Sequence, residues 1–135
     1  EIPYGKLYNW FTVVDSRNVC PTGWHTPSDE EWNTLLAYLG GASAAGGKMK
    51  EAGLVHWTNP NVNADNSGGF TGLPGGYRLN TGTFMDMFDY GYWWSSVEYN
   101  PGTAAYYCSL WHNNSLARMA FNYEAYGLSV RCVKN

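Results

Sequence analysis

The sequence has little charge and no basic excess. Only 14% of its 135 residues are charged, and 8 Lys and Arg stand against 11 Asp and Glu, which gives a formal net charge of −3. A chain without a positive field does not attract phosphate backbones or anionic lipid surfaces. We therefore predict no nucleic-acid partner and, because no apolar run approaches the ~18 residues of a membrane span, no direct membrane insertion.

Cysteine is scarce and odd in number. Cys20, Cys108 and Cys132 allow at most one intrachain disulfide and leave one thiol over. No pair has C-x-x-C spacing, which excludes a thioredoxin-type redox pair and a zinc knuckle. If a bridge forms, the protein works outside the reducing cytosol. Residues 1–6 lack the pattern of a signal peptide, so we expect any export signal or anchor to lie outside this sequence.

Aromatic residues and glycine are in excess. Aromatic residues make up 17% of the chain, with 7 Trp and 11 Tyr, and there are 16 Gly. Disordered segments are poor in aromatics and rich in net charge, so disorder is excluded. A chain of this length buries roughly two thirds of its unfolded surface, and it has no internal repeat or linker. We predict a single domain over residues 1–135. Any function assigned to it has to account for the excess of Tyr, Trp, Gly and Asn.

Two helices are predicted in the first half of the chain. Ser28 and Glu31 form a capping box, and an apolar stripe at helical spacing runs from Trp32 to Leu39 before a Gly-Gly pair. This pattern predicts a helix that begins after Ser28. Residues 43–52 predict a second, shorter helix, although another Gly-Gly pair lies inside it.

Strands and long loops are predicted for the rest. The candidate strands are residues 7–14, 92–96, 104–110, 117–121 and 128–133, all rich in aromatic or β-branched residues or alternating in polarity. Trp10, Trp24 and Trp32 lie in or beside regular elements and are assigned to the core. This order of elements predicts an α+β fold with two helices, short antiparallel strands and long loops.

Six motifs occur in a fixed order along the chain. They are PYGKLYNW at residues 3–10, CPTGWH at 20–25, PSDEEW at 27–32, GFTGLPGGYR at 69–78, WWSS at 93–96 and GLSVRCV at 127–133. The chain thereby resembles the Fibrobacter succinogenes major paralogous domain, a module of bacterial surface and secreted proteins related to the formylglycine-generating-enzyme branch of the C-type-lectin fold. The resemblance runs from about Pro3 to Lys134.

The resemblance implies three features. The fold would be C-type-lectin-like, and the chain would belong to a larger protein that is extracellular or displayed on the cell surface. Cys20 and Cys132 would form a disulfide, because the cysteines of the two corresponding motifs recur together in this family. Such a bridge would tie the segment before the first predicted helix to the last predicted strand.

Residues 94–127 resemble the variable region of proteins that diversity-generating retroelements diversify, which use the same fold. That region is preceded by Trp-Ser-Ser and followed by Gly-x-Ser-Val-Arg-Cys, and its mutagenesis mostly rewrites Asn codons. The resemblance implies a binding surface, encoded by a bacterium or a phage, within residues 99–126. The predicted ligand-binding residues are Tyr99, Asn100, Tyr106, Cys108, Trp111, His112, Asn113, Asn114, Asn122 and Tyr123.

The residue types in this region suit recognition. Tyr and Trp offer large rigid contact area at small entropic cost, and Asn and Ser offer adaptable hydrogen bonds. We predict a non-catalytic recognition module whose partner is a protein receptor or a glycan on another cell. Carbohydrate binding is the alternative, with Trp57, Trp93, Trp94 and Trp111 as candidate stacking platforms. For any single ring, packing in the core stays open.

No cofactor is predicted, but calcium stays open. Oxygen donors lie close together at Asn59, Asn61, Asn63, Asp65, Asn66 and Ser67, and related lectin-like folds often bind calcium there or nearby. Only one of these residues is a carboxylate, and Asx residues also form turns. The three histidines are scattered and do not have the spacing of a zinc site.

Catalysis is not predicted. The wider superfamily includes an oxidase that makes formylglycine with two cysteines close together near its carboxyl end, and this chain lacks such a pair. Cys108 and His112 would lie about 13 Å apart along a strand, too far for a nucleophile and its base. A glycosidase would need a pair of carboxylates at a defined distance, and for Asp86, Asp89, Glu98 and Glu124 this distance cannot be deduced from their positions in loops. A structural module of an envelope protein is a further alternative.

Overall fold

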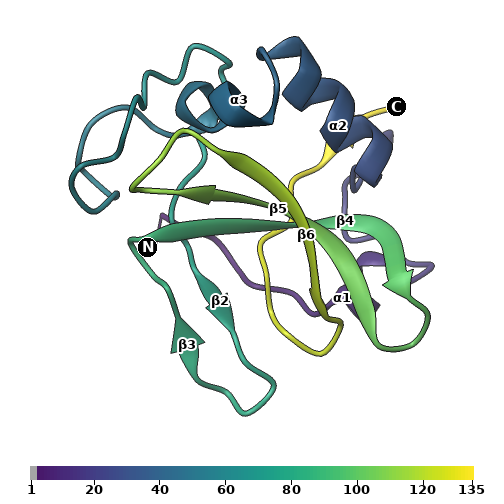
Figure 1. The fold of residues 1–135 in the computed structure, drawn as a ribbon. Coiled ribbons are helices and arrows are strands. Elements are labelled where there is room, and N and C mark those ends of the chain that lie inside the picture. Colours follow the sequence, from purple (N-terminus) through teal and green to yellow (C-terminus); the bar gives the residue numbers. More distant parts are fainter. Residues whose placement is uncertain (1–2) are drawn as a thin grey trace.

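The computed structural model describes residues 3–135, and residues 1 and 2 of the amino-terminal segment discussed above lie outside this range. The elements are α1 (Trp10–Val13), β1 (Trp24–His25), α2 (Asp29–Tyr38), α3 (Ala42–Met49), β2 (Tyr77–Arg78), β3 (Phe84–Met85), β4 (Tyr90–Asn100), β5 (Ala104–Trp111), β6 (Ala117–Tyr123) and β7 (Val133–Lys134). Figure 1 shows helices packed beside short antiparallel strands, which confirms the predicted α+β class. Over the described range, no helix has the length and apolar character to cross a membrane.

The central sheet consists of β4, β5 and β6 in that order, all antiparallel. In its register Trp93 lies opposite Cys108, and Cys108 lies opposite Met119. The helices α2 and α3 pack against one face of this sheet (Figure 1). The core between them joins Trp32 and Met49 to Trp93, Cys108 and other buried residues.

A second core lies on the other face of the sheet. It consists of Trp10, Val13, Trp94, Ala105 and Leu128, surrounded by half-buried tyrosines. The indole nitrogen of Trp10 donates to the Ser95 carbonyl at 2.8 Å, and that of Trp94 donates to the Tyr8 carbonyl at 2.8 Å. Burial therefore leaves neither indole N–H without a partner.

The helix α2 begins and ends as predicted. The Ser28 hydroxyl accepts from Glu31 N at 3.1 Å, and Ser28 N donates to the Glu31 carboxylate at 2.9 Å. Gly41 N bonds to the Leu36 carbonyl at 2.9 Å, which closes the carboxyl end.

The helix α3 is confirmed with shorter bounds than predicted. Its Gly-Gly pair is required by packing, because a Cβ on Gly46 would lie 2.1 Å from the Leu116 carbonyl and one on Gly47 would lie 2.5 Å from the Asn63 carbonyl. The helix ends at Met49 because Lys50 is extended, with φ −70° and ψ 146°.

The strand predicted for residues 7–14 is wrong, because the helix α1 lies within it. The Asn9 side chain accepts from Thr12 N at 3.1 Å, and one turn of helix then buries Trp10 and Val13 on the same side. These two residues pack into the second core, which the local sequence pattern does not contain.

The strand predicted for residues 128–133 is also wrong, because this segment changes partners along its length. Leu128 bridges to Tyr8, Ser129 bridges to Trp93, and β7 pairs with β1 only from Val133 onward. The other predicted strands lie inside β4, β5 and β6.

The assignment of Trp24 to the core is wrong as well. Its side chain is 41% exposed, because the two-residue strand β1 pairs only with β7. Trp10 and Trp32 are buried, as predicted.

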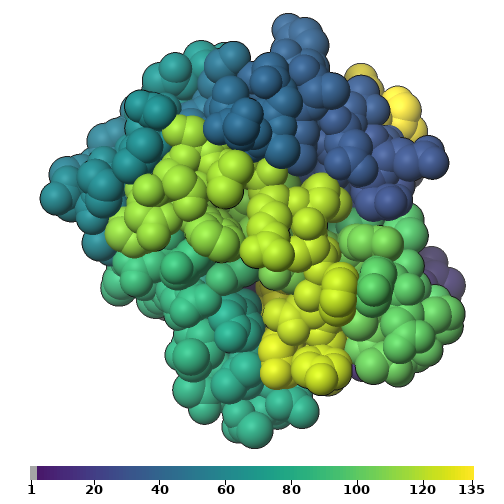
Figure 2. All heavy atoms as spheres, in the orientation of Figure 1, coloured from purple at the N-terminus to yellow at the C-terminus, as the bar shows by residue number. Residues whose placement is uncertain are grey.

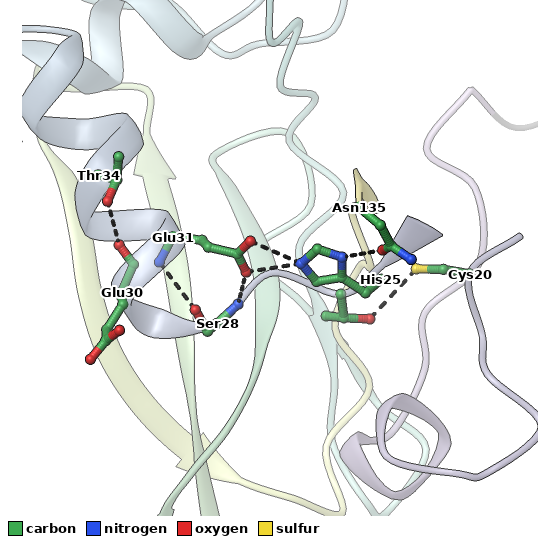
Figure 3. A network of polar contacts seen from close by, with 8 residues as sticks. Cys20, His25, Ser28, Glu30, Glu31, Thr34 and Asn135 are labelled. Carbon is green, nitrogen blue, oxygen red and sulfur yellow. Dashed lines mark hydrogen bonds and ion pairs between the residues drawn. The ribbon is translucent and has the colours of Figure 1, made fainter. Parts of the chain in front are cut away.

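The carboxyl terminus is tied to the start of α2. Cys20 and Cys132 form the predicted disulfide. Figure 3 shows the His25 ring between Glu31 and Asn135: its Nε2 lies 2.9 Å from Glu31 Oε1 and its Nδ1 lies 2.6 Å from Asn135 Oδ1. These contacts join segments separated by more than a hundred residues.

Candidate functional site

A hollow of about 300 Å³ lies where β4 and β6 end beside the β4–β5 turn. We call it the aromatic pocket, and its lining residues are Tyr99, Asn100, Thr103, Ala104, Phe121, Asn122 and Tyr123. Strand register brings them together, since Ala104 lies opposite both Asn100 and Tyr123. In Figure 2 the green residues of this turn lie beside the yellow-green and yellow residues of the end of β6 and the segment after it.

The rings at this pocket are exposed and mutually fixed. Tyr99 stacks flat on Phe121, with ring centroids 3.7 Å apart and planes 6° apart, and Tyr106 meets Tyr99 edge-on at 5.4 Å. Tyr99, Phe121 and Tyr123 are 48%, 50% and 57% exposed. The ladder of β4 shifts register on both sides of Glu98, and such bulges bend a strand and redirect its side chains. The result is a rigid aromatic surface around a hollow.

Polar groups at the pocket are available to a ligand. Within residues 3–135, the hydroxyls of Tyr99 and Tyr123 and the Asn100 amide form no hydrogen bond, and Asn122 uses its Oδ1 to accept from Tyr123 N at 2.9 Å. The pocket thus presents phenol and amide groups but no cation of its own. Five predicted residues, Tyr99, Asn100, Tyr106, Asn122 and Tyr123, lie in or against it.

The other predicted residues lie elsewhere. Trp111, His112, Asn113 and Asn114 lie at the far end of β5, about 23 Å along the strand from the pocket. Trp111 donates through its indole to Ser109 Oγ at 3.2 Å, and His112 contacts the Tyr90 ring edge-on. The structure therefore divides residues 99–126 between two ends of the sheet.

Cys108 is wrongly assigned to a surface. It is 0% exposed and faces the helices in the first core, because the alternation of β5 directs it inward. Burial raises the pKa of its thiol to about 12, so it stays protonated and unreactive. It is free, as the expected Cys20–Cys132 pairing implied, but it cannot touch a ligand outside the core.

The candidate tryptophan platforms are mostly buried. Trp57, Trp93 and Trp94 are 2%, 7% and 0% exposed, and each lies in one of the two cores. Only Trp111 of the four is half-buried, with the Arg118 guanidinium 6.0 Å from its ring. For the first three rings, packing in the core is the role that the structure assigns.

Lys50 organises the far end of the sheet and carries no sequence signal. Its Nζ donates to the carbonyls of Val62, Trp111 and Asn114, each at 2.9 Å. Burial lowers the pKa of this amine to about 8, so it is mostly protonated at neutral pH. Phe121 was also missed as a pocket residue, although it follows Ala117 and Met119 at the spacing of one strand face.

Several polar side chains of residues 59–67 form hydrogen bonds within the chain. The Asn66 Oδ1 accepts from Thr71 N at 2.8 Å, and the Asp65 Oδ1 accepts from Ser67 N at 2.9 Å. Asn61 is buried and donates to the carbonyls of Glu51 and Gly53. The described residues hold no group of three or more His, Cys, Asp or Glu side chains placed for a metal ion. This segment is therefore best explained as turn structure.

A larger hollow, about 540 Å³, lies between α2 and the carboxyl-terminal segment. Its cation, Arg131, stacks on Phe70 with its guanidinium carbon 4.2 Å from the ring centre and donates to the Phe70 carbonyl. Its carboxylate, Glu31, is bonded to His25 and Ser28. Both charged groups are thus already engaged within the chain, in contrast to the phenols and amide of the aromatic pocket.

The chain matches a known family. The model of the Fibrobacter succinogenes major domain matches residues 2–134, a range that contains all six sequence motifs. No curated protein and no solved structure matches the chain. The match confirms the resemblance that the motifs suggested, over nearly the whole chain.

Proposed function

The chain belongs to the Fibrobacter succinogenes major domain family, and we propose that it is a non-catalytic recognition module that binds its ligand at the aromatic pocket. One observation carries the proposal: Tyr99, Phe121 and Tyr123 are exposed and border a hollow of about 300 Å³. Exposed clusters of this kind mark interaction sites. The free phenols and the Asn100 amide supply hydrogen bonds that orient a ligand.

A protein receptor is the proposed partner. Rigid tyrosines surrounded by small polar residues are the composition of antibody binding sites, and tyrosine is enriched among residues that dominate binding energy. The Cys20–Cys132 disulfide supports a position outside the cell or on its surface, since such bridges persist in oxidising compartments. We propose a C-type-lectin-like scaffold within a larger surface protein.

Diversification by a retroelement is part of the proposal. In such a protein the core positions Cys108, Leu110 and Ala117 stay constant, and the pocket positions Tyr99 and Asn122 vary. The test is genomic: a reverse-transcriptase gene and a near-copy of the segment that encodes residues 94–133 should lie beside this gene. An isolated gene without either would contradict diversification and leave the binding proposal standing.

A glycan is the second candidate ligand. The pocket is lined by aromatic faces and by the Asn100 and Asn122 side chains, with no charged residue among its lining residues. Sugars stack their C–H faces on such rings and bond their hydroxyls to amides. The pocket volume of about 300 Å³ is at the lower end of small-ligand sites.

Oxidase chemistry of the formylglycine-generating type has no support. Cys132 is bridged to Cys20, and Cys108 is buried in the core with its pKa raised to about 12. The chain therefore lacks two free thiols that could act together.

The proposal is tested by screening the immobilised chain against a glycan array and a panel of purified bacterial surface proteins. We expect the Tyr99→Ala/Tyr123→Ala variant to lose at least about 90% of the binding seen with the wild type, because truncated hot spots typically cost more than ~1.4 kcal/mol. Tyr38→Ala is the matched control, because Tyr38 is 86% exposed on α2. A folded double variant that keeps its binding would contradict the proposal.

A further inference from the structure

Glu124 is a buried acid beside the aromatic pocket. It follows Tyr123 directly and is 2% exposed. Neither of its carboxyl oxygens accepts a hydrogen bond from an N–H or O–H group of residues 3–135. An ionised carboxylate in this position has lost its water and gained no partner, which disfavours the charged form.

The charged group that acts on Glu124 is a second carboxyl. Glu98 lies on β4 directly before Tyr99, and its Oε1 accepts from Gly102 N at 3.1 Å. Burial, and after it the charge and the hydrogen-bonding carboxyl of Glu98, raises the pKa of Glu124. Two neighbouring carboxyls can form a hydrogen bond with each other only when one of them carries a proton.

Uncharged groups surround Glu124, whereas Glu98 is exposed to solvent. A hollow of about 360 Å³ beside Glu124 is lined by Phe11 of α1, by Gly102 and Thr103 of the β4–β5 turn, and by Asn80, Tyr123, Ala125 and Tyr126. Within residues 3–135, no Lys, Arg or His forms an ion pair with Glu98 or Glu124; the ion pairs there are Arg17–Asp15, His25–Glu31 and His56–Glu51. No neighbouring cation therefore balances two negative charges.

We propose that Glu98 and Glu124 share one proton and that this proton holds the aromatic pocket together. The protonated Glu124 carboxyl donates to the Glu98 carboxylate, which keeps its bond from Gly102 N. Glu98 and Glu124 are chain neighbours of the pocket residues Tyr99 and Tyr123, so a change at the two carboxyls reaches the pocket. The effect of the proton on ligand binding rests on the proposed function. Loss of the proton leaves two like charges side by side and drives the ends of β4 and β6 apart.

A proton fits this site better than a metal ion does. Both Glu124 oxygens are already enclosed, and a proton bridges two carboxyls without added volume. Calcium takes six to eight oxygen ligands, and the described residues gather no third carboxylate, histidine or cysteine at this place.

The first test measures the proton itself and needs no ligand. Carboxyl NMR of the wild type should show Glu124 titrating above the ordinary 4.5 of a glutamate. The Tyr99 ring signals, shifted by the stacked Phe121 ring, should change over the same pH range. Glu124→Gln, whose amide can donate to Glu98 at any pH, should show neither change.

The second test is stability against pH. A group whose pKa is higher in the folded than in the unfolded state contributes its full stability below the pKa of the unfolded state. This contribution is lost as pH rises through the pKa of the folded state. The melting temperature of Glu124→Gln should therefore rise relative to that of the wild type as pH rises. The ratio of the two folding equilibrium constants should change by about tenfold for each pH unit by which the pKa of Glu124 is raised. Glu30→Gln, which removes an exposed carboxylate on α2, is the control for the loss of one negative charge.

Three outcomes would overturn the proposal: an ordinary Glu124 titration, a constant difference between Glu124→Gln and the wild type, or stabilisation of the wild type but not of Glu124→Gln by millimolar calcium. The two proposals fail separately. If Glu124 titrates as expected but Tyr99→Ala keeps its binding, only the proposed function fails. If Tyr99→Ala loses binding and the stability difference is constant, only the shared proton fails.

Discussion

Lys50 shows how one buried side chain can join segments that lie far apart in the sequence. Its buried ammonium bonds three carbonyls, two of which, those of Trp111 and Asn114, flank the β5–β6 turn. The third, the Val62 carbonyl, belongs to the long loop after α3. A single charge thus joins a turn to a loop at the end of the sheet opposite the aromatic pocket.

Lys50→Met should destabilise the protein by about 2 to 4 kcal/mol, because it leaves buried carbonyls without donors. Equilibrium denaturation in urea measures this loss. Lys6→Met is the control for the loss of one positive charge, because Lys6 is exposed. Equal stability of the two variants would show that the three carbonyls find other partners.

At the scale of elements, the start of α2 is held by two sets of contacts. The capping box between Ser28 and Glu31 is local, and Glu31 also contacts His25, which reaches Asn135 at the other end of the chain (Figure 3). The hydrogen bond to Asn135 and then the contact with Glu31 raise the pKa of His25. The bond from Ser28 N is the largest cause that lowers the pKa of Glu31.

This junction should give a pH-dependent stability. The contribution of His25 to stability is complete below 6.5, the pKa of an unfolded histidine, and is lost as pH rises through the higher pKa of the folded state. The contribution of Glu31 to stability is present above 4.5, the pKa of an unfolded glutamate, and is lost as pH falls through the lower pKa of the folded state. The difference in melting temperature between the wild type and His25→Ala should therefore be largest between these values and shrink in alkaline solution. A difference that grows with pH would contradict this assignment.

Elements could be predicted where their causes are local. The helix α2 follows from a cap, a stripe and a glycine stop within its own residues. The helix α1 was predicted as a strand because the contacts that decide it, such as Trp10 to Ser95, span 85 residues. The segment 128–133 alternates like a strand, but it meets Tyr8, Trp93 and β1 in turn.

At the scale of the whole molecule, the disulfide closes nearly the entire chain. It spans 112 residues and joins the segment before α2 to the residue directly before the last strand, β7. Closing a loop of this length stabilises the folded state by about 4 to 5 kcal/mol in the chain-entropy account, and removal of such bridges typically costs ~2–5 kcal/mol.

The Cys20→Ser/Cys132→Ser variant should therefore lose about 2 to 5 kcal/mol of unfolding free energy. Denaturation with and without dithiothreitol measures this loss. The reductant should destabilise the wild type and leave the variant unchanged, because Cys108 forms no bridge. A wild type that is indifferent to reductant would contradict a stabilising role.

The sequence predicts a binding surface within residues 99–126, and the aromatic pocket lies in that range, but the outline of the pocket could not be predicted. The composition of residues 99–126 indicates recognition, yet Trp111 lies at the opposite end of the eight-residue strand β5 from the pocket, and Cys108 is buried. Phe121 lines the pocket and stacks on Tyr99 across the sheet. These relations depend on strand register. Bulges in β4 shift this register, and composition does not encode it.

The central claim is that the aromatic pocket binds the ligand. Its most direct test is the dissociation constant of the strongest binder from the glycan array or the surface-protein panel, measured for the wild type, Tyr99→Ala and Tyr38→Ala by calorimetry. The account predicts a rise of at least about tenfold for Tyr99→Ala and no change for Tyr38→Ala. Equal constants for all three, with Tyr99→Ala folded, would contradict it.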